Sequence, residues 1–286
     1  RRRWPTRGGA FPPQEDSLKS PRVLFALLPV LALGATLVVA DEGMWMPQQI
    51  PDLAATLKTM GFQGDPTAFA DLTGYPMGAV VSLGGCTASL VSPEGLIVTN
   101  HHCVQGSLQY NSTPERNLLQ DGFLAKTREE ELWNGPGSRV SVTVSVREVT
   151  EEMLGKMPAK LTDRDRYALI ERRVKAQTSV CEKGGLRCRI ASFFQGMRYF
   201  EIAQMEILDV RLVYAPAAGI GNFGGETDNW QWPRHVGDFS FYRAYVGTDG
   251  QPAAFSKDNL PYQPKQYLRV SPQGAGPGEL VLVAGY

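Results

Sequence analysis

The sequence predicts a mainly β fold, an antiparallel barrel or sandwich that carries a helical insertion. Short β-rich runs follow one another at residues 79–83, 87–91 and 96–100, and a Ser-Pro-Glu-Gly turn at 92–95 separates the last two. Residues 139–146 alternate perfectly between polar and apolar side chains, which is typical of a strand with one buried face. The 30 Gly and 20 Pro also suit many turns between short strands better than a helical bundle.

The remaining elements are predicted by periodicity. Residues 52–60 favour a short helix, and residues 150–180 form the expected helical insertion. In that insertion Thr162 offers an N-cap, and one helix face carries Tyr167, Ile170 and Val174. Further strands are expected at two places between 199 and 214, at 238–246 and at 280–283.

Composition excludes some classes of partner. The 29 basic and 29 acidic side chains balance, so we expect no nucleic acid and no anionic membrane as a partner. The apolar share of 43% is that of an ordinary globular protein.

Residues 1–40 are predicted to be upstream sequence and a secretory signal peptide. Basic residues precede an uncharged run at 23–40 that ends in Val-Val-Ala, and Asp41 and Glu42 follow at once. A membrane anchor is the alternative, since the run is nearly long enough to span a bilayer. Pro29 and the small residues at the end favour a cleaved signal, hence export to the periplasm or the outer membrane, while the exact cleavage site stays open.

Four cysteines in an exported chain suggest two disulfides. Cys86 is expected to pair with Cys103, and Cys181 with Cys188, because each pair is local. Buried free thiols are the alternative.

The segment 85–103, GCTASLVSPEGLIVTNHHC, carries the sharpest chemical signal. It resembles the segment around the general-base histidine of trypsin- and chymotrypsin-like serine peptidases, in which a disulfide closes the hairpin. His102, next to Cys103, matches the base, and His101 would face away. A metal site of adjacent His and Cys is the alternative. Adjacent residues of a strand point to opposite faces, so the two histidines would not converge on one ion. We therefore expect no metal and no cofactor.

A general-base histidine needs a carboxylate to fix its tautomer, and Asp238 is the best candidate. It lies downstream, as the order His-Asp-Ser requires, and it begins the strand-like run 238–246. A solvated aspartate at the start of a strand is the plain alternative.

Longer motifs identify a particular family. Residues 43–49, 85–103, 180–196 and 219–245 together resemble the bacterial dipeptidyl-peptidase 7 and 11 family of chymotrypsin-like serine peptidases. The resemblance implies a double β-barrel with a large helical cap, and release of dipeptides from the free N-terminus of oligopeptides. It also implies that Asn229 and Trp230 clamp the substrate's α-ammonium group. Core packing is the alternative for Trp230.

The nucleophile is missing from this sequence. The segment 221–225 has the outline of a Gly-x-Ser-Gly motif, but Phe223 occupies the serine position and the segment precedes Asp238. Residues 41–286 are therefore expected to be the N-terminal part of the peptidase, inactive alone, with the helical cap and second barrel absent. An exported trypsin-like endopeptidase and a catalytically inactive binding barrel remain alternatives. The sequence leaves open a homodimer and the side chain preferred before the cleaved bond.

Overall fold

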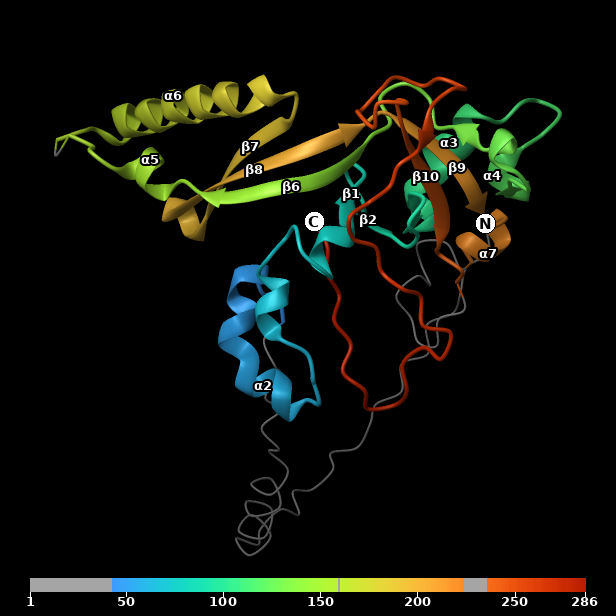
Figure 1. The fold of residues 1–286 in the computed structure, drawn as a ribbon, viewed down its shortest axis with the longest axis horizontal. Coiled ribbons are helices and arrows are strands. Elements are labelled where there is room, and N and C mark those ends of the chain that lie inside the picture. The colour runs from blue at the N-terminus through green and yellow to red at the C-terminus, as the bar shows by residue number, and fades with distance from the viewer. Residues whose placement is uncertain (1–42, 159, 224–235) are drawn as a thin grey trace, which may run out of the picture. The chain divides into compact units, whose positions relative to one another are not determined.

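The computed structural model describes residues 43–158, 160–223 and 236–286, and those from Trp45 onward form one unit (Figure 1). The signal-peptide prediction for residues 1–40 therefore lies outside the described residues. Within the described ranges, no helix is both long and apolar enough to cross a membrane.

Eleven strands of the described residues form one sheet, and all their pairings are antiparallel. They are β1 (Val80–Ser82), β2 (Thr87–Leu90), β3 (Leu96–Thr99), β4 (Phe123–Leu124), β5 (Leu132–Trp133), β6 (Val140–Glu148), β7 (Arg187–Phe193), β8 (Arg198–Ile207), β9 (Asp209–Ala215), β10 (Ser240–Val246) and β11 (Leu260–Pro261).

The α-helices are short apart from one. They are α2 (Ala54–Thr59), α3 (Gln105–Tyr110), α4 (Leu118–Asp121), α5 (Thr150–Leu154), α6 (Asp163–Cys181) and α7 (Ala218–Gly221). Short 3₁₀ segments connect many elements: η1 (Pro47–Leu53), η2 (Pro66–Phe69), η3 (Met77–Ala79), η4 (His101–Val104), η5 (Arg128–Glu130), η6 (Glu182–Gly184) and η7 (Phe194–Gly196).

The sheet closes on itself through one nearly continuous strand. Its order is β4-β9-β10-β3-β2-β1-β6-β8-β7, so β8 and β9 lie near opposite ends of the path. Only Leu208 separates β8 from β9 along the chain. Because β8 pairs with β6 and β9 pairs with β10, this run joins the two ends and makes an antiparallel barrel. The predicted mainly β, antiparallel fold is confirmed.

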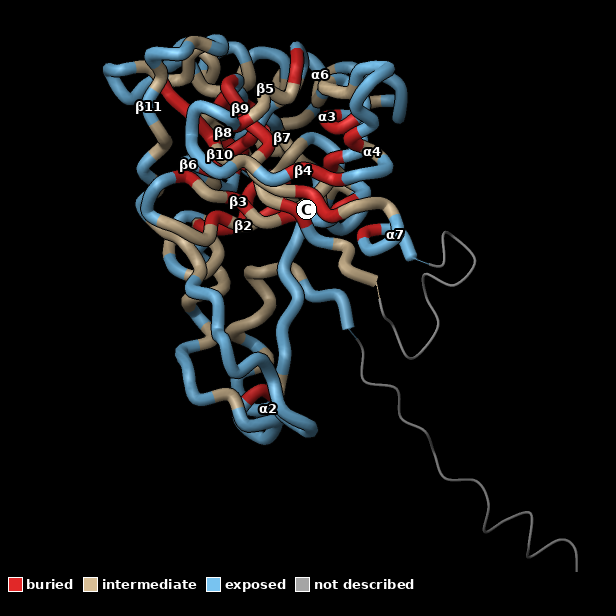
Figure 2. Tube along the Cα trace, turned by 90° about the vertical axis from the view of Figure 1, so that its right-hand side faces the viewer, coloured by how far each residue is buried: buried red, intermediate tan, exposed pale blue. Residues whose placement is uncertain are grey.

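The barrel interior is the hydrophobic core. Val140 of β6 lies opposite Ile207 of β8, and both are fully buried. Tyr242 of β10 lies opposite Leu212 of β9 and is buried in the same cluster. Figure 2 shows the buried residues concentrated on these strands.

Beyond the barrel, β6 and β8 continue together as an arm. The pairing runs on to Glu148 opposite Phe200, after a bulge between Thr143 and Ser145 where β6 changes from buried to exposed. A second, small core lies in this arm, formed by Val149, Met153 and Tyr199, with Ile170 and Val174 of α6 packed against it.

Helix α6 packs on β7 and is held at both ends. Thr162 caps its start by accepting a hydrogen bond from the backbone N–H of Asp165 at 3.2 Å, and the disulfide Cys181–Cys188 joins its end to β7. Tyr167, which shares the helical spacing of Ile170 and Val174, does not join this small core. It is exposed and donates a hydrogen bond to Glu171 instead.

The strand expected at 280–283 was wrong. These residues form no strand, and the side chain of Val283 is 99% exposed. Apolar β-formers become a strand only beside a partner, and no strand among the described residues pairs with them. Strand β7 was not predicted, because its residues lack a clean alternation.

Two adjacent residues at the point where the barrel closes, Ile207 and Leu208, allow a matched test of the barrel core. Ile207→Ala should lower the free energy of unfolding by about 2–4 kcal/mol, since it leaves a cavity at a fully buried position. Leu208→Ala, one residue away and 43% exposed, should cost less than about 1 kcal/mol. Urea unfolding of both variants gives the comparison; equal losses would contradict the barrel assignment.

Candidate active site

A disulfide fixes the end of the β2–β3 hairpin. Cys86 lies just before β2, and Cys103 lies in η4, directly after β3; their Cα atoms are 6.2 Å apart. The bond therefore holds η4 against the start of the hairpin. Closing a loop of 17 residues should contribute about 3 kcal/mol, mainly by restricting the unfolded chain. Both predicted disulfides are present.

The two adjacent histidines point in different directions, although not for the reason expected. They lie in the 3₁₀ turn η4 and not on a strand. In such a turn, consecutive side chains are about 120° apart. His101 is consequently only 1% exposed, whereas the side chain of His102 is 61% exposed.

Asp238 lies beside His102. Its Oδ2 is 2.9 Å from the ring Nδ1 of His102, and its Oδ1 accepts the backbone N–H of His102 at 3.1 Å. Asn100 adds its side-chain amide, which donates to Oδ2 at 3.1 Å and to the backbone carbonyl of Asp238 at 3.2 Å. Strand pairing accounts for this meeting, because Ser240 of β10 is in register with Thr99 of β3.

These contacts keep the carboxylate ionised. Partial burial raises the pKa of Asp238, but the backbone and ring hydrogen bonds from His102, the charge of that ring and the amide of Asn100 outweigh it. The net result is a pKa below the ordinary range. An ionised carboxylate can only accept, so Nδ1 of His102 must carry the proton that bonds to it.

Asn100 was missed in the sequence analysis. It is the N-cap residue of η4 and follows β3 directly. Its sequence position gave little signal, because an asparagine before a turn ordinarily bonds to nearby backbone, whereas Asn100 bonds to Asp238 on the neighbouring strand segment.

A metal site at this place is disfavoured by the disulfide. Ligand atoms of Cys86, His102 and Cys103 lie within 4.8 Å of one another. However, the two sulfurs are bonded to each other, so neither is the thiolate that a metal would need.

Two predicted site residues cannot be placed. Asn229 and Trp230 fall in 224–235, outside the described residues. The segment that leads to them ends in Phe223, which is exposed.

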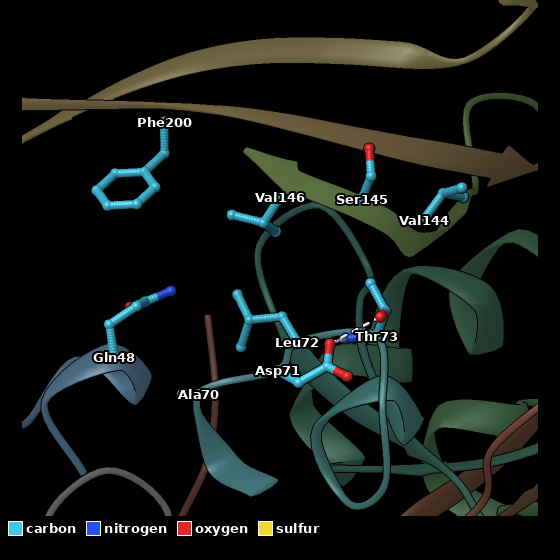
Figure 3. Close-up of a pocket in the computed structure, with 9 residues that line it drawn as sticks. All are labelled: Gln48, Ala70, Asp71, Leu72, Thr73, Val144, Ser145, Val146 and Phe200. Atoms are coloured by element: carbon cyan, nitrogen blue, oxygen red, sulfur yellow. Dashed lines mark hydrogen bonds between the residues drawn. The ribbon is translucent and has the colours of Figure 1, made fainter. Parts of the chain in front are cut away.

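A cleft of about 300 Å³ elsewhere does not belong to this site (Figure 3). It is lined from one side by Gln48 and by residues 70–73, and from the other by residues 144–146 of β6 and Phe200 of β8. Its one carboxylate, Asp71, already accepts the N–H and the hydroxyl of Thr73. Neither His102 nor Asp238 lines the cleft.

An antiparallel barrel that presents a histidine, hydrogen-bonded to an aspartate, behind a disulfide-closed hairpin defines a class: the chymotrypsin-like serine peptidases. Comparison with known families agrees. The peptidase S46 family profile matches residues 40–286, and the chain belongs to this family.

Similar proteins are dipeptidyl-peptidases. The chain is 47% identical over 263 residues to an Asp/Glu-specific dipeptidyl-peptidase of Shewanella putrefaciens, covering 91% of the chain and 36% of that protein. It is 38% identical to dipeptidyl-peptidase 7 of Porphyromonas gingivalis, covering 90% of the chain and 36% of that protein. The predicted resemblance to the dipeptidyl-peptidase 7 and 11 family is confirmed.

A solved structure shares the fold. The crystal structure of Porphyromonas endodontalis DPP11 in complex with the dipeptide Arg-Glu matches with a TM-score of 0.72 at 39% identity. The match covers 83% of this chain and 36% of that one. The chain thus spans about a third of the length of the relatives it matches.

The hydrogen bonds on Asp238 predict how its carboxyl titrates. In ¹³C NMR titrations, His102→Ala should raise the pKa of Asp238 toward the ordinary range, because the ring's bond and charge are lost. The pKa of Asp65, which Thr67 holds low at a distant turn, should not move. The pKa of Asp238 is lower in the folded protein than in the unfolded chain. The contact between Asp238 and His102 therefore stabilises the fold at a pH above the unfolded-state pKa of Asp238. This stabilisation is lost as the pH falls through the folded-state pKa of Asp238. An unchanged Asp238 pKa in His102→Ala would contradict the assigned contacts.

Proposed function

We propose that the complete protein is a serine-type dipeptidyl aminopeptidase, and that this chain supplies its general base, His102, and the partner of that base, Asp238. The observation that carries the proposal is the 2.9 Å contact between His102 Nδ1 and Asp238 Oδ2 beside an otherwise exposed ring. The pair leaves the second ring nitrogen, Nε2, free of Asp238.

The proposed chemistry follows from this geometry. With its proton on Nδ1, His102 presents the lone pair of Nε2, which accepts the proton of an attacking serine hydroxyl. Asp238 then stabilises the imidazolium that forms, and its three hydrogen bonds keep it from turning away. The proton passes next from Nε2 to the leaving amine.

The nucleophile belongs to another part of the complete protein in this proposal. The 286 residues contain no Gly-x-Ser-Gly sequence, and the relatives are almost three times as long as the part matched here. The chain alone is therefore expected to release no dipeptide.

The proposed substrates are oligopeptides with a free N-terminus. The relatives' names support dipeptide release, and a related structure holds the dipeptide Arg-Glu. Asn229 would accept hydrogen bonds from the substrate's ammonium, and Trp230 would form a wall that limits how far the N-terminus enters. The apolar run at 23–40 supports export to the periplasm as part of this proposal.

The two alternatives have less support. An endopeptidase would need no ammonium clamp, and an inactive binding barrel would need no ordered His–Asp pair. The relatives reported above are named as dipeptidyl-peptidases, which favours neither alternative.

Loss of the proposed proton relay should abolish turnover in the complete protein. His102→Ala and Asp238→Asn should each lower kcat by about 10⁴-fold, the latter because the amide favours the wrong tautomer of His102. Asp249→Asn, a loop aspartate that caps the N–H of Gln251, serves as the matched control and should leave kcat unchanged. Initial rates on a chromogenic dipeptide substrate test this; a fully active Asp238→Asn would remove Asp238 from the mechanism.

The aminopeptidase assignment depends on recognition of a free amine. Asn229→Ala in the complete protein should lower kcat/KM by about 10- to 100-fold, the usual worth of a hydrogen bond to a charged group. Acetylating the substrate's amine should abolish cleavage by the wild type and change little further in the variant. Free and N-acetylated tripeptides assayed on both enzymes provide the comparison. Equal cleavage of the two by the wild type would favour the endopeptidase.

A further inference from the structure

His101 is a buried titratable side chain that the proposed mechanism does not use. It is 1% exposed, and its Nδ1 has no hydrogen-bond partner among the described residues. Burial lowers the pKa of His101 below the ordinary histidine range, with the neighbouring His102 acting in the same direction and Asp238 against it. Burying the Nδ1 atom of His101 without a hydrogen-bond partner costs free energy. The contacts of the ring are therefore the place to look for a role.

The ring of His101 lies against the backbone of α7. A Cβ added to Gly221, the last residue of α7, would lie 2.4–2.7 Å from the ring atoms Cγ, Cδ2 and Nδ1 of His101. Nothing but a glycine allows this approach. Gly219, in the same helix, differs completely, because a Cβ there would meet nothing within 4 Å.

Helix α7 in turn holds the residue that precedes Asp238. The carbonyl of Ile220 accepts the N–H of Gly237 at 2.8 Å, and a Cβ at Gly237 would lie 2.8 Å from Cγ2 of Ile220. The contacts therefore form a closed loop that starts and ends at adjacent residues: His101, Gly221, Ile220, Gly237, Asp238 and His102.

We propose that His101 is a positioning residue: its buried ring supports α7, and α7 fixes Gly237 and so places the carboxylate of Asp238 opposite His102. The consequence for catalysis rests on the function proposed above; the positioning itself does not. One histidine would move the proton while its neighbour sets the geometry for that movement.

The test compares two glycines of one helix. Gly221→Ala in the complete protein should lower kcat by about 10- to 100-fold, the effect expected of a displacement of about 1 Å at the reacting groups. Gly219→Ala should leave kcat unchanged. Because the added methyl collides with the His101 ring, Gly221→Ala should cost much less in a His101→Ala background, which gives a non-additive double-mutant cycle.

A second readout needs no activity. Diethyl pyrocarbonate acylates accessible neutral imidazoles, and fragment ions in tandem mass spectrometry separate adjacent histidines. His101 should be protected and His102 modified in the wild type, while Gly221→Ala should expose His101 and raise the pKa of Asp238 measured by ¹³C NMR. If the wild type releases no dipeptide, the proposed function fails and this readout still tests the positioning.

Several results would overturn the proposal. One is a Gly221→Ala protein with unchanged kcat and a protected His101. Another is equal loss in Gly219→Ala, and a third is a cost of Gly221→Ala that persists in full when His101 is alanine. If Gly221→Ala fails to fold, His101→Ala alone decides: a raised Asp238 pKa in that variant supports the proposal, and an unchanged Asp238 pKa contradicts it.

Discussion

Both oxygens of the Asp238 carboxylate are held by one short segment, Asn100 to His102, at the end of β3. Three features of the fold keep this segment and Asp238 together. The disulfide of Cys103 keeps η4 in place, the pairing of β3 with β10 brings Asp238 to the same edge, and the barrel makes that pairing rigid. A carboxylate that accepts three hydrogen bonds has little freedom left to rotate, and a histidine bound to it has one tautomer.

The sequence was informative about this centre because the relevant signals are local. Cys86, His102 and Cys103 lie at the two ends of one short hairpin, so the disulfide could be expected from the sequence, whereas the 3₁₀ turn that leaves the His102 ring exposed could not. A base needs a carboxylate downstream, and Asp238 could be selected among several aspartates because the sequence around it resembles the family's motif. Its actual contacts with the backbone of His102 and with Asn100 depend on the register of β3 and β10, which no periodicity reveals.

Other features could not be predicted, for physical reasons that differ. The contact of His101 with Gly221 joins residues far apart in sequence, and a glycine alone does not say what approaches it. The apolar residues 280–283 have the composition of a strand but no partner among the described strands. Tyr167 keeps the helical period of Ile170 and Val174, yet the small core of the arm does not reach it. Periodicity predicts which residues of a helix or strand share one face, but it does not predict how many of those residues a neighbouring core covers.

The arm has a consequence for how this fold can change over time. Its ladder is an outward continuation of β6 and β8, which also form the barrel wall, and the bulge at Thr143–Ser145 marks where the two parts meet. Side chains alternate along a strand, so residues added to or lost from the ladder in matched pairs beyond this bulge would preserve which face each side chain occupies. A single added residue would reverse the faces, unless a second bulge absorbed it. The arm can therefore lengthen or shorten during evolution in steps of two, while the register that places His102 and Asp238 stays as it is.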